Sequence, residues 1–169
     1  MIKRIKITDF KSIRELDMTF DPVTVLVGRS GTGKSNIVQA IRFLRNILLN
    51  QEQAIGYEGG WWRIVPVGEK HPKTSIEVAF SFPGQEHEYN YRIAFRSEDG
   101  QDRDRLMAER LVVGQDTIFS RSLAPNSGWK WETEPGVSPV PYHTNGPMLG
   151  SFPSLEKAVL AGAALSNGK

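Results

Sequence analysis

The sequence has no cysteine among its 169 residues, and this absence excludes two classes of site. Without thiols the chain can form neither a disulfide framework nor a thiolate metal centre. Long apolar runs are missing as well. No stretch is long enough to cross a bilayer, and residues 1–6 carry lysine and arginine where a secretory signal would have its apolar region. We therefore expect an unexported, cytoplasmic protein.

An excess of charge of one sign is also missing. Lysine and arginine together number 21, aspartate and glutamate 19, and the formal net charge is only +2. A field this weak does not by itself indicate a nucleic-acid partner. The three histidines are far apart and lack the spacing of metal ligands: they are His71, His87 and His143. We expect no metal ion other than Mg²⁺ bound through phosphates.

One stretch carries the complete phosphate-loop pattern G-x-x-x-x-G-K-[ST], in the residues Gly28, Arg29, Ser30, Gly31, Thr32, Gly33, Lys34 and Ser35. An apolar, strand-like run over 23–27 precedes the pattern, and helical periodicity begins at Asn36, which is the context that the motif requires. The glycines let backbone N–H groups turn toward phosphate oxygens, and a helix N-terminus adds the positive end of its dipole. The sequence therefore predicts a nucleoside triphosphate site rather than a plain connecting turn.

Two side chains of the loop have distinct predicted roles. Lys34 should reach the β- and γ-phosphates, and the hydroxyl of Ser35 should ligate the Mg²⁺ that bridges them.

Alternating apolar residues predict strands over 2–10 and 16–20 and a third, buried strand over 23–27. Apolar residues at helical spacing predict an amphipathic helix over 34–49. Two strands thus precede the strand of the phosphate loop, whereas small GTPases and nucleoside kinases usually place that loop after their first strand. This order favours a different branch of nucleotide-binding proteins.

The composition changes after residue 50. Alternation over 75–82 and 89–95, with a Pro83-Gly84 turn between them, predicts an antiparallel hairpin, and further strands are expected at 110–113, 117–120 and 129–133. We expect one α/β domain or lobe in three parts. These are a nucleotide core (1–50), an antiparallel β-rich insert (51–134), and a Pro/Gly-rich connector with a short helix over 154–165 (135–169).

The first 50 residues resemble the N-terminal lobe of ABC-type ATPases of the RecF, Rad50, SMC and OLD-like group, also known as AAA-15 or AAA-21 ATPases. The resemblance rests on the segment Ile5-Lys6-Ile7-Thr8-Asp9-Phe10-Lys11-Ser12-Ile13, the phosphate loop and the Asn36 that follows it. To about residue 134 it holds only in general character. It implies a P-loop NTPase lobe that binds ATP and Mg²⁺, with Asn36 in the site and Phe10, Lys11 and Ser12 beside the base and ribose.

By the same resemblance, the complete protein would be an ATPase that couples ATP binding and hydrolysis to nucleic-acid maintenance or phage defence, with an ATP-dependent homodimer as one expected assembly. Several family features are absent or ambiguous. No apolar run ends in the Asp-Glu of a Walker B strand, and residues 165–169 are only a weak likeness of the signature motif. Five glutamines compete for the Q-loop: Gln51, Gln53, Gln85, Gln101 and Gln115. We therefore expect a missing C-terminal lobe or second subunit, and no hydrolysis by this chain alone.

Two other classes remain open. A small-molecule or nucleoside kinase would need a lid, for which Asp102-Arg103-Asp104-Arg105 is the available stretch. A non-catalytic interaction module would use the tryptophans Trp61, Trp62, Trp129 and Trp131, which suit either an interface or, as we favour, the core; base stacking is the weaker option. A GTPase is disfavoured because no Asn-Lys-x-Asp motif is present.

Overall fold

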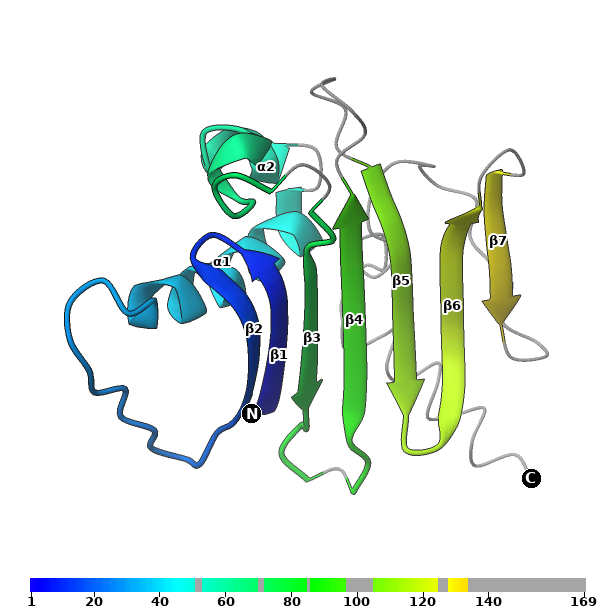
Figure 1. Ribbon diagram of the computed structural model, residues 1–169. Coiled ribbons are helices and arrows are strands. Elements are labelled where there is room, and N and C mark those ends of the chain that lie inside the picture. The colour runs from blue at the N-terminus through cyan, green and yellow to red at the C-terminus, as the bar shows by residue number, and fades with distance from the viewer. Residues whose placement is uncertain (51–52, 70–71, 85, 97–104, 125–127, 134–169) are drawn as a thin grey trace.

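The computed structural model describes residues 1–169 except 51–52, 70–71, 85, 97–104, 125–127 and 134–169 (Figure 1). For residues 50, 96, 105–107, 123–124 and 128–133 only the backbone is described. The expected connector, the helix over 154–165 and the signature-like residues 165–169 lie outside the described part.

Seven strands form one sheet, in which every neighbouring pair is antiparallel and the order is β2-β1-β3-β4-β5-β6-β7. The strands are β1 (Ile2–Phe10), β2 (Ile13–Thr19), β3 (Ser75–Phe80), β4 (Tyr89–Arg96), β5 (Arg105–Val113), β6 (Asp116–Ala124) and β7 (Gly128–Thr133). The strands expected at 2–10, 16–20, 110–113, 117–120 and 129–133 are thus confirmed, as is the hairpin of β3 and β4. The predicted nucleotide core (1–50) and the predicted β-rich insert (51–134) share this one sheet, because β1 pairs with β3.

The connection between β2 and β3 holds all the described helices: α1 (Lys34–Asn50), α2 (Gln53–Tyr57) and the short 3₁₀-helix η1 (Trp61–Arg63). The chain leaves the sheet after β2, runs through the phosphate loop and these helices, and returns to place β3 beside β1 (Figure 1). The predicted helix over 34–49 is confirmed. This excursion carries the phosphate loop and the helix of the predicted nucleotide core, whereas the first two strands of that core belong to the sheet.

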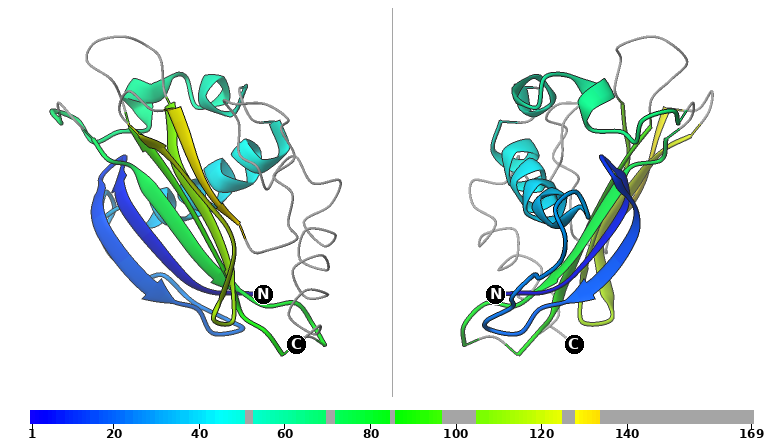
Figure 2. Two further views of the ribbon diagram at one scale, coloured as in Figure 1. Left: turned by 90° about the vertical axis from the view of Figure 1, so that its right-hand side faces the viewer. Right: turned by 60° about the vertical axis from the view of Figure 1, so that its left-hand side comes forward.

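Helix α1 covers one face of the sheet (Figure 2). Its apolar stripe consists of Ile37, Ala40, Phe43, Leu44 and Ile47, all buried. The ring of Phe43 lies 5.6 Å from that of Phe10 on β1 and 5.9 Å from that of Phe95 on β4, and Phe95 in turn lies 5.8 Å from Trp61. Aromatic contacts therefore link the helix, the sheet and the 3₁₀-helix, as offset ring pairs do in protein cores.

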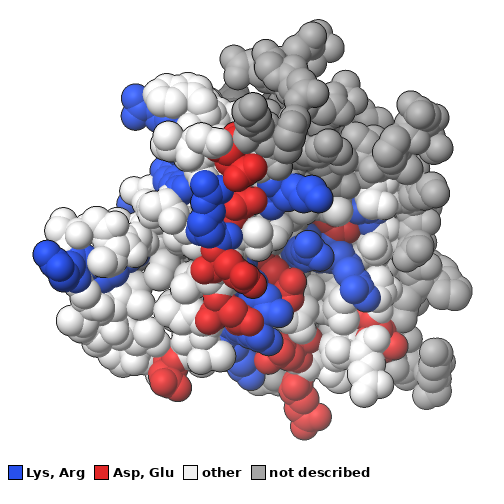
Figure 3. All heavy atoms as spheres, viewed as in Figure 1, with Lys and Arg blue, Asp and Glu red and all other residues white. Residues whose placement is uncertain are grey.

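The other face of the sheet is polar, and charges of both signs are interleaved on it (Figure 3). On β1 the guanidinium of Arg4 donates to the carboxylate of Asp17 on β2 at 2.6 Å, and this hydrogen bond holds the pKa of Asp17 below its usual value. One strand face is thus buried and the other solvated, which is the arrangement that period-two alternation predicts for an antiparallel sheet.

The buried face also holds an ion pair. Arg121 on β6 donates to Glu109 on β5 at 2.7 Å, and the phenol of Tyr91 on β4 donates to the same carboxylate at 2.7 Å. All three side chains are buried, and burial raises the pKa of Tyr91 well above its ordinary value. Each charge is compensated by its partner, since an unpaired charge in this position would be very unfavourable.

The prediction of a buried strand over 23–27 is wrong. Residues 21–29 contain no strand, and Val23, Val25 and Val27 are 82%, 76% and 89% exposed. Only Leu26 packs against the core. An apolar run becomes a strand when a neighbouring strand accepts its backbone hydrogen bonds, and in the described residues this run has no such neighbour (Figure 1).

The exposure of residues 23–27 can be tested by comparing the stabilities of two valine-to-threonine variants. Val25→Thr should change the free energy of unfolding by less than about 0.5 kcal/mol, because the side chain is in water. Val78→Thr on β3, where the side chain is only 5% exposed, should lose about 1–3 kcal/mol because its hydroxyl would be buried without a partner. Urea unfolding of the two variants measures both values. A loss at Val25 as large as that at Val78 would contradict the unpaired arrangement.

Candidate functional site

The phosphate loop leads directly into α1, which begins at Lys34 as the sequence predicts. The N–H groups of Asn36 and Ile37 donate to the carbonyl of Gly33 at 2.9 and 3.3 Å, which forms the first turn of the helix. Gly31 and Gly33 have φ values of +82° and +88°, where a side chain is strained. The two glycines therefore give the loop a backbone course that other residues would resist.

Lys34 turns back over its own loop. Its ammonium donates to the carbonyl oxygens of Gly28 and Arg29 at 2.6 and 2.5 Å and to the hydroxyl of Thr32 at 3.2 Å. Thr32 in turn donates to the carbonyl of Arg29 at 2.9 Å. The loop thus closes around the ammonium of Lys34 at the N-terminal end of α1. A helix N-terminus favours a bound anion, and the ammonium adds a positive charge at the same place.

Ser12 joins the turn between β1 and β2 to the phosphate loop. Its hydroxyl accepts a hydrogen bond from the side-chain amide of Asn36 at 2.7 Å. A Cβ added to Gly33 would lie 3.1 Å from the same hydroxyl, so the loop backbone passes directly against Ser12. The structure brings together Ser12, Gly33 and Asn36, three of the residues proposed for the site.

Lys11 is held elsewhere. Its ammonium lies 2.8 Å from Glu58 and donates to the side-chain oxygen of Gln39 on α1 at 2.7 Å. Its backbone has φ of +53°, and its N–H donates to the carbonyl of Ile64 at 2.6 Å. Lys11 therefore ties the β1–β2 turn to α1 and to the segment after α2, and Phe10 beside it is buried.

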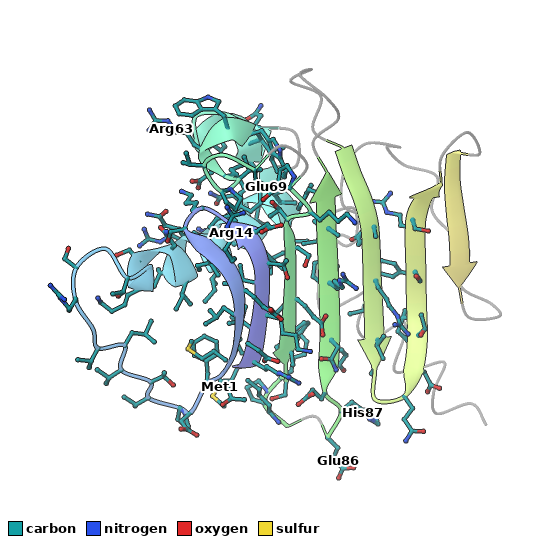
Figure 4. All side chains as sticks on the ribbon, in the orientation of Figure 1. Met1, Arg14, Arg63, Glu69, Glu86 and His87 are labelled. Atoms are coloured by element: carbon teal, nitrogen blue, oxygen red, sulfur yellow. The ribbon has the colours of Figure 1, made fainter. Side chains whose placement is uncertain are left out.

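Sequence reasoning missed Gln39 and Glu58, the residues that hold Lys11 and with it the β1–β2 turn. Gln39 follows Ser35 by four residues, so helical periodicity could have placed it on the same face, whereas Glu58 stands in an irregular segment and gave no signal. Arg14 reaches Glu69 at 2.9 Å and Asp9 at 3.6 Å, and Figure 4 shows Arg14 and Glu69 facing each other.

The other predicted residues are distributed differently. The side chains of Arg29, Ser30 and Ser35 are exposed, so the hydroxyl of Ser35 is accessible at the start of α1. Of the glutamines, Gln53 accepts a hydrogen bond from Tyr57 within α2 and Gln115 lies exposed in the β5–β6 turn. Gln51, Gln85, Gln101 and Arg103 lie outside the described residues, and for Arg105, Trp129 and Trp131 only the backbone is described.

The residues present fit a magnesium nucleotide. The loop offers a cation, a helix N-terminus and glycine positions without side chains, which together suit the phosphates. A Cβ at Gly28 would lie 3.7 Å from the ammonium of Lys34, so this part of the loop backbone runs directly beside the lysine. Ser35 supplies the oxygen that a hard cation such as Mg²⁺ prefers.

The chain is similar in sequence to several known proteins. A model of the AAA ATPase domain family matches residues 1–113. The DNA replication and repair protein RecF of Arthrobacter sp. (strain FB24) is 43% identical over 47 residues, which are 27% of this chain and 12% of that protein. RecF of Halalkalibacterium halodurans is 30% identical over 95 residues, 53% of this chain and 26% of that protein.

The chromosome partition protein Smc of Myxococcus xanthus is 40% identical over 86 residues, 48% of this chain and 7% of that protein. The chain thus spans about a quarter or less of the curated relatives that it matches. A solved structure described as "Structural biochemistry of ATP-driven dimerization and DNA stimulated activation of SMC ATPases" gives a TM-score of 0.46 at 20% identity, and the match covers 69% of this chain and 70% of that one. No helix in the described part is long and apolar enough to cross a membrane.

A graded series of glycine substitutions tests the loop geometry. Gly33→Ala should destabilise the fold by about 1–3 kcal/mol, because the φ is positive and the Cβ meets Ser12. Gly31→Ala, with a positive φ but no atom within 4 Å of the added Cβ, should lose only the backbone part, about 1–2 kcal/mol. Thermal unfolding gives the order.

Gly56→Ala is the control for this series. Gly56 lies in α2 with open space around the added Cβ and no positive φ, so alanine should be neutral or stabilising there. If Gly33→Ala proved as mild as Gly56→Ala, the described course of the loop would be incorrect.

Proposed function

The chain belongs to the AAA ATPase domain family, and on this premise we propose that it is the ATP-binding lobe of a RecF/SMC-like ATPase. The observation that carries the proposal is the complete phosphate loop, closed around the ammonium of Lys34 at the N-terminus of α1. A family match of this kind implies nucleotide binding. That the nucleotide is ATP with Mg²⁺, and that these residues hold it, are parts of the proposal.

Each residue of the loop has a defined task in this proposal. Gly28, Gly31 and Gly33 admit the phosphates to the backbone N–H groups, and Lys34 exchanges its hydrogen bonds with loop carbonyls for bonds with phosphate oxygens. Ser35 ligates the metal ion. Ser12 and Asn36 fix the loop from the side of the sheet. Bound Mg-ATP would supply the phosphoanhydride bond whose hydrolysis drives the complete protein.

Lys11 has a different task from the one that the resemblance implied. Its ammonium is already paired with Glu58 and bonded to Gln39, so in this arrangement it orients the β1–β2 turn that carries Ser12. We propose it as a positioning residue, and it meets a nucleotide only if the pair with Glu58 opens.

The exposed valines support a missing partner segment. An apolar run with alternating side chains in water exposes both backbone and apolar surface, which soluble proteins usually cover. We propose that a strand from a C-terminal lobe or a second subunit pairs with residues 23–27 and completes the site from that side. The residues that orient the attacking water would belong to that partner segment. This chain alone should therefore bind ATP without rapid hydrolysis.

We infer the biological role from the proteins to which the chain is similar. The proteins named above act, by their names, in DNA replication, repair and chromosome partition, and the SMC ATPase structure is described with ATP-driven dimerisation and DNA stimulation. We therefore favour nucleic-acid maintenance over phage defence, propose an ATP-dependent homodimer of the complete protein, and retain a cytoplasmic location. The kinase and interaction-module alternatives receive no support from the family match.

Removal of the loop lysine tests the proposal. Lys34→Ala should weaken Mg-ATP binding by about 10- to 150-fold in a calorimetric titration, because a charge-assisted hydrogen bond to phosphate is lost. Lys73→Ala is the matched control, since Lys73 is exposed just before β3 and its removal changes the net charge equally. Equal binding by wild type and Lys34→Ala would show that the loop is not the nucleotide site, and stronger competition by GTP than by ATP would contradict the choice of nucleotide.

A further inference from the structure

The segment after α2 presents two neighbouring tryptophans in opposite directions. Trp61 is only 5% exposed and packs on Phe95, whereas Trp62 is 65% exposed. The buried ring anchors η1 to the core, so the exposed ring projects from a fixed base. Such a large aromatic surface in water is a candidate for binding, because rigid aromatic side chains lose little entropy when they are covered.

Two glycines set the position of the exposed ring. Gly59 and Gly60 have φ values of +86° and +98°. A Cβ on Gly60 would lie 3.1 Å from the indole nitrogen of Trp62, and one on Gly59 would lie 3.1 Å from the side chain of Arg63. Both side chains therefore rest against bare backbone, which limits the conformations open to them before any ligand arrives.

Arg63 completes the surface. Its guanidinium lies 4.6 Å from the centre of the Trp62 ring, within the range of a cation–π contact. In Figure 4 Arg63 lies at the outer end of the α2 region, away from the sheet. One ring and one cation are thus held together at an exposed end of the molecule.

The charge of Arg63 is available to a ligand. The two acidic residues of this segment are engaged elsewhere, since Glu58 pairs with Lys11 at 2.8 Å and Glu69 with Arg14 at 2.9 Å. Within the described residues no ion pair is recorded for Arg63. As far as the described residues go, the local surface therefore combines an exposed aromatic face with one positive charge that has no ion-pair partner.

We propose that Trp62 and Arg63 bind an unpaired nucleobase and an adjacent phosphate of a single-stranded nucleic acid. The base stacks on the indole and the phosphate contacts the guanidinium, a combination that binds single strands without reading sequence. A protein partner would need a contiguous apolar centre in a patch of about 800 Å², whereas the contacts that the structure shows for the Trp62 ring are with the backbone at Gly60 and the guanidinium of Arg63. The inference rests on the nucleic-acid role proposed above and names where a strand would bind, at a surface that does not involve the phosphate loop.

Binding of a ten-nucleotide oligomer of deoxythymidine to the 169-residue chain tests this proposal, in low salt and without ATP. Trp62→Leu should weaken binding by roughly 5- to 150-fold, because it keeps an apolar side chain but removes the stacking face. Trp62→Phe should keep most of the affinity. Tryptophan emission should fall when the oligomer binds to wild type, and this quenching should be smaller in Trp62→Phe although the oligomer still binds.

Arg63→Gln tests the phosphate contact. The dependence of affinity on salt should become shallower by about 0.7 in the log–log slope, as expected for the loss of one single-strand phosphate contact. Arg45→Gln is the matched control, since Arg45 is an exposed arginine on α1 and its loss should leave the slope unchanged. Thermal unfolding of each variant should match wild type, because Trp62 and Arg63 are exposed.

Two further measurements give definite answers. Lys34→Ala should bind the oligomer as wild type does, which separates this surface from the nucleotide site. Adenosine monophosphate at the same concentration should not displace the oligomer, and displacement would assign the ring to free nucleotide instead. Absence of binding, or equal affinity of wild type and Trp62→Leu, would overturn the proposal and leave a protein partner as the reading to pursue.

Discussion

The contact of Phe43 with the sheet is the interaction on which the candidate site depends. The ring of Phe43 on α1 packs against the rings of Phe10 and Phe95 on the buried face of the sheet, and burial of such aromatic surface contributes several kcal/mol. The phosphate loop leads directly into the first residue of this helix, so the position of the helix determines the position of the loop. Hydrogen bonds within the loop shape it, but hydrophobic packing one to three turns away determines where it lies.

The sequence predicts most of the sheet and all of the loop motif. Period-two alternation identified β1, β3 and β4 because their two faces lie in different environments, and the G-x-x-x-x-G-K-[ST] spacing located the helix start at Lys34. The expected α/β lobe of the P-loop class is confirmed by the family match. Pairing partners were not predictable in the same way, since alternation says which face is buried but not which strand lies beside it.

Residues 23–27 and Lys11 show this limit most clearly. Val23, Val25 and Val27 carry a strong strand signal, yet the described chain provides no neighbouring strand and they remain in water. The family resemblance placed Lys11 beside the base and ribose, yet Glu58, forty-seven positions away, lies 2.8 Å from its ammonium. In both cases the outcome depends on a partner distant in sequence, and local pattern contains no information about such partners.

The pairing of β1 with β3 has a consequence for how the molecule folds. Ile5 pairs with Val78, so about seventy residues, including the phosphate loop and all the described helices, lie between two strands that must meet. Closing a long excursion costs conformational entropy before the contacts that compensate for it can form, and topologies with many such contacts fold slowly. The β1–β2 and β3–β4 hairpins, which are local, can form early. The pairing of β1 with β3, which closes the segment that carries the phosphate loop, should therefore form late, after the two hairpins are in place.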